Sequence, residues 1–278
     1  MKSAKGQVVR NKKRKPIIAD FHIHTVASGH AYSTILEYAK EAKKRKLKYI
    51  AITDHGPAMP DGPHYYYFCN LQMLPLEVDG VKILRGIEAN IINNDGALDL
   101  DNEIFDRIHF VLATFHPRCG YENQGEEKNT DTMIKAMDNP HLCAIAHPEN
   151  AQFPVDFKRL AEAAKEKDIL IEVNNSSYLS RPGTKDRIVQ ILKEVKRVGG
   201  NICLGTDSHI ATMVGKFDYA LTICREVDFP VENIINYSEE LIKKYIKPVK
   251  TAESPKLMAC KNQGIDQCNQ HHLVHKVV

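Results

Sequence analysis

Asp20-Phe21-His22-Ile23-His24 places two histidines one residue apart at the end of a short apolar run. Side chains at positions i and i+2 of an extended chain lie on the same face, so His22 and His24 can present both imidazoles to one metal ion. A third histidine, His30, follows closely. The stretch therefore predicts a β-strand whose end forms part of a metal site.

The same arrangement of an apolar run followed by a polar side chain recurs along the chain. The runs are Ile17–Phe21, Tyr49–Thr53, Lys82–Ile87, His109–Thr114, Leu142–Ala146, Ile169–Val173 and Ile202–Gly205. The polar positions after them are 22, 55, 88, 116, 147, 174 and 207, so that neighbours lie 27 to 33 residues apart. Runs of this length and composition are typical of buried strands.

Amphipathic segments between the runs predict helices. Residues Ser33–Lys46 begin with Thr34 and Glu37 in capping-box spacing. Further helical patterns cover Asp156–Lys167 and Thr184–Val198, and Gly199 follows the latter as a stop. Strands that alternate with helices indicate right-handed crossovers and a parallel sheet. We expect a closed or nearly closed α/β barrel of seven strands, with an open doubly wound sheet as the alternative.

The composition limits the classes of partner. The 278 residues include 38 basic and 35 acidic side chains, and a net charge of +3 is too even to indicate a nucleic-acid or membrane partner. Seven cysteines occur without CxxC spacing, and no basic start is followed by an apolar signal segment. We therefore expect a protein of the reducing cytoplasm.

The two ends of the chain differ from the segment between them. Residues 1–16 contain seven Lys or Arg and no acid, which predicts a basic, flexible extension. Residues 247–278 lack helical or strand periodicity and predict a poorly ordered tail. A single catalytic domain is expected over residues 17–246.

The polar residues at the predicted strand ends suit a metal centre. Seven histidines and two carboxylates are candidate ligands, namely His22, His24, His30, His55, Glu88, His116, His147, Asp207 and His209. Imidazole and carboxylate without thiolate favour zinc, iron or manganese. Because a zinc ion takes three or four protein ligands, nine ligands with one bridging carboxylate would serve about three ions. Clusters of several metal ions are suited to the hydrolysis of phosphate esters.

Several short motifs resemble the PHP (polymerase and histidinol phosphatase) family. They are DFHIHT (20–25), AITDHG (51–56), RGIEAN (85–90), FHP (115–117), AHP (146–148) and GTDSH (205–209). HAYST (30–34), LRGIEANI (84–91) and NNSS (174–177) resemble its YcdX-type branch of bacterial phosphatases. The resemblance extends from about Ile17 to about Ile246.

The resemblance implies a distorted seven-stranded (β/α)7 barrel, similar to the TIM barrel, with a trinuclear metal site at the C-terminal strand ends. Carried over by position, the ligands are His22, His24, Glu88 and Asp207 for one ion, Glu88, His116 and His147 for a second, and His30, His55 and His209 for a third. No ligand position is substituted. Asp20 and Asp54 are expected to orient ligand imidazoles, and ordinary strand-end or capping aspartates are the alternative.

These residues predict a metal-dependent phosphatase that hydrolyses small phosphomonoesters. The three divalent ions are most simply Zn²⁺, with Mn²⁺ or Fe²⁺ as alternatives. Their charge would exceed that of the two carboxylates and a bridging hydroxide by about three, and this positive excess would attract a phosphate dianion. We expect that hydroxide, positioned by Glu88 and Asp207, to attack phosphorus in line. The general acid and the oligomeric state are left open.

Two other functions fit the same residues. A phosphodiesterase or 3′–5′ exonuclease would use the basic extension to hold nucleic acid, a partner that is less favoured than a small metabolite. A binding or regulatory module would use the metal ions only for its structure.

Four further residues are candidates for substrate contacts. His64 lies beside Tyr65–Phe68 in a predicted loop that could form a pocket wall or pack on itself. Arg118 and Arg181 could hold phosphate oxygens, although surface arginine is the simpler interpretation. Asn174, with Asn175, could order water or substrate, or form an Asx turn.

Overall fold

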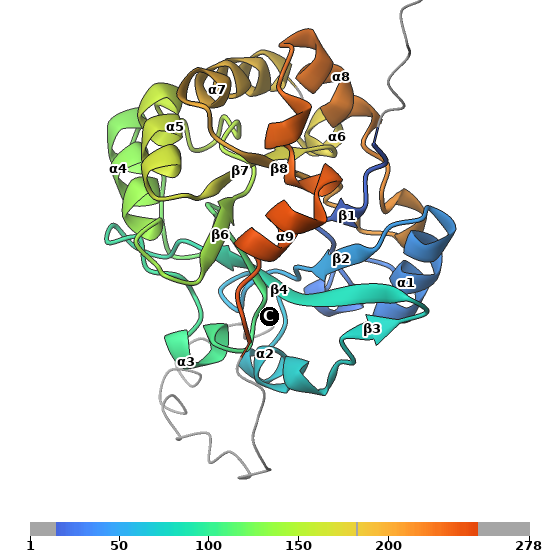
Figure 1. Cartoon of the computed structure of the whole chain (residues 1–278). Helices are drawn as coiled ribbons and strands as arrows, with labels where there is room; N and C mark the ends of the chain where they lie inside the picture. Colours follow the sequence, from blue (N-terminus) through green and yellow to red (C-terminus); the bar gives the residue numbers. More distant parts are fainter. Residues whose placement is uncertain (1–14, 182, 250–278) are drawn as a thin grey trace, which may run out of the picture.

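The chain folds around a seven-stranded parallel barrel (Figure 1). The computed structural model describes residues 15–181 and 183–249. The barrel strands are β1 (Ala19–Asp20), β2 (Tyr49–Ile52), β4 (Val81–Asn90), β5 (Phe110–Thr114), β6 (Leu142–Ile145), β7 (Leu170–Asn174) and β8 (Ile202–Gly205). Neighbours in this order pair in parallel, and the short β3 (Glu77–Val78) pairs antiparallel with the start of β4.

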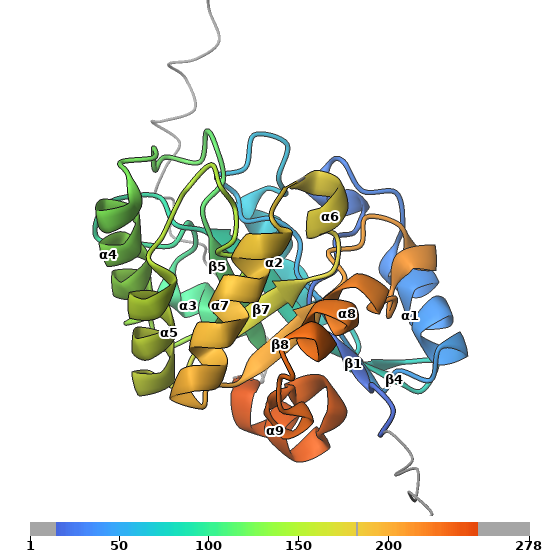
Figure 2. The same ribbon diagram turned by 90° about the horizontal axis from the view of Figure 1, so that it is seen from above.

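Helices surround the barrel and cover one of its ends. They are α1 (Ile35–Lys44), α2 (Tyr65–Asn70), α3 (Asn102–Phe105), α4 (Glu126–Ala136), α5 (Phe157–Glu166), α6 (Ser177–Ser180), α7 (Lys185–Val198), α8 (Asp218–Glu226) and α9 (Glu239–Tyr245). Figure 2 shows α9 beneath the barrel and α6 at the opposite end, with α4, α5 and α7 on one side and α8 and α1 on the other.

The barrel closes between β1 and β8, its first and last strands. Just beyond them, the amide of Asp207 donates to His22 O at 2.8 Å and the amide of His24 donates to Ser208 O at 3.0 Å. The buried side chain of Asn236 joins the same two strands lower down, since it donates to Ala19 O and Leu204 O, each at 2.9 Å, and accepts from the Leu204 amide at 2.8 Å. Closure therefore places the residues after β1 beside those after β8.

The interior of the barrel is apolar near α9. Side chains alternate along the strands, so every second residue faces inward. Large rings at Phe21 and Phe110, 4.8 Å apart, are packed among small side chains such as Ala51, Ala144 and Cys203. Ile242 of α9 completes this cluster. The apolar floor leaves the other end of the barrel for polar groups.

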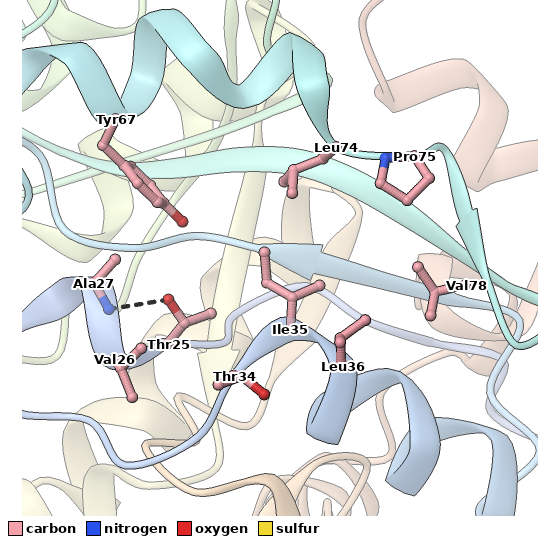
Figure 3. A pocket seen from close by; sticks show the side chains of 10 residues that line it. All are labelled: Thr25, Val26, Ala27, Thr34, Ile35, Leu36, Tyr67, Leu74, Pro75 and Val78. Carbon is pink, nitrogen blue, oxygen red and sulfur yellow. Dashed lines mark hydrogen bonds between the residues drawn. The ribbon is translucent and has the colours of Figure 1, made fainter.

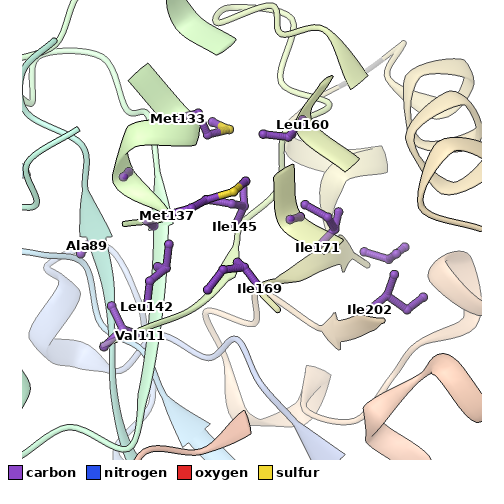
Figure 4. Packing of buried hydrophobic residues seen from close by; sticks show 14 of the residues in the cluster. Ala89, Val111, Met133, Met137, Leu142, Ile145, Leu160, Ile169, Ile171 and Ile202 are labelled. Atoms are coloured by element: carbon purple, nitrogen blue, oxygen red, sulfur yellow. The ribbon is translucent and has the colours of Figure 1, made fainter. Parts of the chain in front are cut away.

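A second apolar layer lies between the outside of the sheet and the helices. Met133 and Met137 of the α4 segment and Leu160 of α5 pack against outward-facing strand residues such as Ile145 and Ile171 (Figure 4). A third cluster joins α1 to β2 and β4. These layers hold the helices against the sheet and so fix where each strand ends.

The predicted barrel is confirmed, and the open doubly wound alternative is not observed. Each predicted strand lies within three residues of the observed bounds at either end. Thr34 and Glu37 form the predicted capping box of α1, and Gly199 ends α7 in a left-handed conformation with a φ of 66°. Residues 65–68, expected in a loop, instead belong to α2.

The predicted extension of residues 1–16 and tail of residues 247–278 fall almost entirely outside the described residues. Within the described part of the chain, no helix is long and apolar enough to cross a membrane. The five cysteines in this part of the chain are buried.

Asn236 tests the closure of the barrel. Replacing Asn236 by Ala removes three hydrogen bonds to buried backbone groups of β1 and β8, which should cost about 3 to 5 kcal/mol of unfolding free energy. Asn233 provides a matched control, because its side chain makes one hydrogen bond, to Gly200 O, and its replacement by Ala should cost about 1 kcal/mol. Urea denaturation measures both, and equal small losses would show that Asn236 does not hold the barrel closed.

Candidate metal centre

The structure brings all nine predicted ligands to one end of the barrel. Four overlapping groups each place their ligand atoms within 4.8 Å of one another, and they are His22–His24–Asp207, His22–Glu88–His147, His55–Glu88–His116 and His24–His55–His209. His30 joins them through its Nε2, which lies 3.2 Å from Nε2 of His55. These nine residues are called the metal cluster below.

Glu88 lies at the middle of the metal cluster and is 1% exposed. It follows Leu84 and Gly86 on the inward face of β4, so it points into the barrel above the apolar floor. Five imidazole nitrogens surround its two oxygens: His147 Nε2 at 2.7 Å and His116 Nε2 at 3.6 Å from Oε1, and His55 Nδ1 at 2.7 Å, His22 Nε2 at 3.5 Å and His24 Nε2 at 3.5 Å from Oε2. A carboxylate in this position can bridge two cations.

Asp207 provides the second carboxylate. Its Oδ1 lies 3.2 Å from His24 Nε2, 3.7 Å from His22 Nε2 and 3.7 Å from His209 Nδ1. Asp207 and the candidate ligand His147 both have positive φ, at 50° and 56°, which is uncommon for residues with a side chain. Such strain is concentrated at functional sites, where the surrounding structure holds it in place.

Partners outside the metal cluster fix the orientation of its imidazoles. His24 Nδ1 lies 3.1 Å from Ser28 Oγ, and that hydroxyl donates to Asp54, so the imidazole must donate to the serine. In the same way His116 Nδ1 donates to Asn90 Oδ1 at 2.8 Å. When Nδ1 carries the proton, the lone pair of a neutral imidazole is on Nε2, which faces Glu88.

Burial favours the protonation states that bind metal. It lowers the pKa of His116 to about 3 and that of His24 well below its usual value, so both imidazoles are neutral at pH 7. Burial raises the pKa of Glu88 and Asp207, but the surrounding histidines outweigh it and hold both carboxyls well below their usual range. Burial also lowers the pKa of His22, but the charges of Glu172, Glu88 and Asp207 outweigh it and hold that pKa well above its usual value. The metal cluster therefore combines ionised carboxylates with neutral imidazoles at His24 and His116 and a proton at His22 that a bound metal ion would replace.

The atoms at the centre lack protein partners that would satisfy them. Glu88 Oε2 and His55 Nδ1 are buried and lie 2.7 Å apart, but neither makes a hydrogen bond. The Nε2 atoms of His22 and His24 are only 2.9 Å apart. If Nδ1 carries the proton on both rings, the two Nε2 lone pairs face each other, which is unfavourable unless a proton or a metal cation lies between them. This donor set of imidazole and carboxylate fits zinc, manganese or iron.

Asp20 and Asp54 support the metal cluster indirectly. Asp54 accepts from Thr25, from Tyr67 OH at 2.5 Å and from Ser28 Oγ at 2.7 Å, so it reaches His24 only through Ser28. Asp20 accepts from Thr206 Oγ1 at 2.6 Å and from the backbone amide of Gly215 at 2.9 Å. Its carboxylate thus joins the residues that follow β8 rather than an imidazole ring.

The four candidate substrate residues separate into two pairs. Arg181 NH1 lies 3.5 Å from Asp207 Oδ2, and Asn174 Nδ2 lies 3.1 Å from the same oxygen, so both reach the metal cluster. His64 is exposed, and its ring accepts from the Tyr66 amide as the N-cap of α2. Arg118 is also exposed.

Several residues at the site were not anticipated from the sequence. Ser28, Asn90, Thr114 and Glu172 contact the outer nitrogens of His24, His116, His147 and His22, respectively. Glu172 offered one signal, because an acidic residue inside the apolar run of β7 needs a buried partner. Asn90 lies two residues after Glu88 and so shares its face of β4.

An apolar pocket of about 360 Å³ lies beside the site, between the start of α1 and α2 (Figure 3). Thr25 and Tyr67 form part of its wall, and the hydroxyls of both donate to Asp54. The remaining lining is mostly aliphatic, including Ile35, Leu36 and Leu74. With no charged residue in its lining, the pocket is unsuited to a phosphate group.

Residues 20–253 match the family model of the PHP domain. The chain belongs to the PHP family. A "probable phosphatase" of Acetivibrio thermocellus is 46% identical over 230 residues, which are 83% of this chain and 95% of the relative. The "probable phosphatase YcdX" of Escherichia coli O81 is 43% identical over 229 residues, covering 82% and 93% of the two chains. The resemblance to the YcdX-type branch is thereby confirmed, and the names of these relatives agree with the prediction of a phosphoester hydrolase.

A solved structure supports the fold independently. Histidinol phosphate phosphatase of Lactococcus lactis, in complex with zinc, L-histidinol and phosphate, superposes with a TM-score of 0.55. It is 21% identical, and the alignment covers 77% of this chain and 95% of that protein. At this identity the similarity supports the shared barrel fold.

Proposed function

We propose that this protein is a metal-dependent phosphatase that hydrolyses small phosphomonoesters at a centre of three divalent ions, most simply zinc. The observation that carries the proposal is the convergence of Glu88 and eight other candidate ligands at one end of the barrel, where Glu88 Oε2 and His55 Nδ1 make no hydrogen bond. The names of the curated relatives and the zinc and phosphate bound by the Lactococcus lactis enzyme support it.

The distances support a division of the ligands among three ions. The proposed sets are His22, His24, Glu88 and Asp207 for the first ion, Glu88, His116 and His147 for the second, and His30, His55 and His209 for the third. Glu88 belongs to two of these sets, and one of its oxygens faces each of them. When bound, the ions would supply hydroxide at neutral pH and neutralise phosphate oxygens.

Glu88 and Asp207 are proposed to set the charge and geometry of the reaction site. Both are ionised and buried, and the hydrogen bond from Asn174 orients Oδ2 of Asp207. Fixed charges in a site of low dielectric need little reorganisation during the reaction.

Arg181 is proposed to bind the phosphate group of the substrate. The serine hydroxyls of Ser177 and Ser180 accept from its NH1 at 3.2 Å each and hold it at the rim, where 14% of its side chain is exposed. A guanidinium can bind two phosphate oxygens at once. Because the Arg181 guanidinium lies 3.5 Å from the Asp207 carboxylate, its positive charge is at the edge of the metal cluster.

An aryl phosphate assay tests the proposed function. The purified chain should release inorganic phosphate, lose this activity after chelation, and recover it when zinc, manganese or iron is added, because these ions suit the donor set. Single-stranded DNA serves as the comparison substrate. No recovery with any of the three metals would refute the scheme, and nucleotide release without monoesterase activity would favour a nuclease.

The proposed role of Arg181 predicts a specific kinetic effect. Replacing Arg181 by Gln removes a charge-assisted contact worth about 1.5 to 3 kcal/mol, so kcat/KM for the aryl phosphate should fall about 10- to 150-fold. Inhibition by inorganic phosphate should weaken in parallel. Arg225→Gln, an exposed change on α8, is the control and should retain wild-type kinetics. Unchanged phosphate inhibition in Arg181→Gln would contradict the role.

A further inference from the structure

Glu172 is a buried acid whose position in the barrel needs explanation. It lies between Ile171 and Val173 in β7, is 2% exposed, and faces inward with Leu170 and Asn174. Removing a carboxylate from water costs free energy unless a charged or hydrogen-bonded partner compensates. Its main partner is His22, whose Nδ1 lies 2.7 Å from Glu172 Oε1, and Asn174 Nδ2 donates to Glu172 Oε2 at 3.4 Å.

This contact differs from those of the other imidazoles in the metal cluster. His24 and His116 have neutral partners at their outer nitrogens, a serine hydroxyl and an asparagine amide. The Nδ1 atom of His22 instead contacts the carboxylate of Glu172, which is not a candidate ligand. The negative charge of Glu172 keeps the proton on Nδ1 and increases the electron density at Nε2.

Gly205 of β8 provides the space for this pair. A Cβ atom at Gly205 would lie 2.1 Å from Glu172 Oε1 and 2.4 Å from the Cβ of His22. Both distances are far below van der Waals contact, and the Cβ of His22 cannot move without its backbone. The three strands β1, β7 and β8 are therefore fitted to one another around the contact between Glu172 and His22.

We propose that Glu172 is a positioning residue that orients His22 and strengthens it as a metal ligand, without binding metal itself. This inference rests on the proposed metal centre and adds a residue that acts on it from behind. The carboxylate is hydrogen-bonded on the side of His22 away from Glu88 and Asp207, whereas Nε2 of the same ring faces both of them. Glu172 thus links the floor of the barrel to the proposed metal centre.

Zinc affinity of the full-length protein tests the proposal. Replacing Glu172 by Gln retains the shape and an acceptor oxygen but removes the charge, and competition with a chromogenic chelator should show zinc bound about 10- to 100-fold more weakly at one site. The visible spectrum of the Co²⁺-loaded protein should also shift, because the ligand field of His22 changes. Glu149→Gln is the matched control, since Glu149 is equally buried but pairs with the Ser177 hydroxyl.

The outcomes separate this proposal from the proposed function. The role of Glu172 would be overturned if Glu172→Gln kept the zinc affinity and the Co²⁺ spectrum of the wild-type protein. It would also be overturned if Glu172→Gln and Glu149→Gln lost zinc affinity equally, and neither result depends on the phosphatase assay. A wild-type protein that binds zinc but hydrolyses no phosphoester would instead refute the function and leave this test valid. If Glu172→Gln does not fold, Glu172→Asp decides: its shorter side chain should weaken zinc binding, and wild-type affinity would contradict the proposal.

Discussion

The burial of Glu88 among five imidazoles is the constraint on which the rest of the site depends. An ionised carboxylate in the interior of a barrel is unfavourable unless positive charge or hydrogen bonds compensate for its lost hydration. His22, whose pKa the neighbouring carboxylates hold well above its usual value, supplies part of that charge, whereas His24 and His116 stay neutral. Glu88 Oε2 and His55 Nδ1 lie 2.7 Å apart and make no hydrogen bond. Divalent cations would satisfy the carboxylate and the nitrogens together.

The fold makes this arrangement by dividing the barrel interior into two zones. Aromatic and small apolar side chains fill the end near α9. Further along the strands the inward-facing residues are acidic, as Leu84 is followed by Glu88 on β4 and Leu170 by Glu172 on β7. Closure between β1 and β8 brings His22 beside Asp207 although 185 residues separate them in sequence. The site is therefore a consequence of strand register as much as of residue type.

Sequence reasoning found most of the candidate ligands because they lie in or shortly after an apolar run, where periodicity is strongest, whereas His30 lies nine residues beyond the first run. It could not locate the partners of their outer nitrogens, since the contact between Glu172 and His22 depends on how β1 and β7 face each other across the barrel. Helix α4 was missed because its buried face carries Asn129, Thr130 and Thr132, which weakens the apolar pattern. The aromatic run after His64 forms helix α2, although its spacing offers no helical stripe.

Counting the metal ions in the purified protein tests the central claim most directly. Elemental analysis of the wild-type chain, prepared without chelators, should find about three divalent ions per molecule, as nine ligands with one bridge require. The variant Glu88→Gln, which retains the shape of the side chain but not its charge, should bind fewer. Trace metal in the wild-type protein, or an unchanged count in Glu88→Gln, would contradict the account.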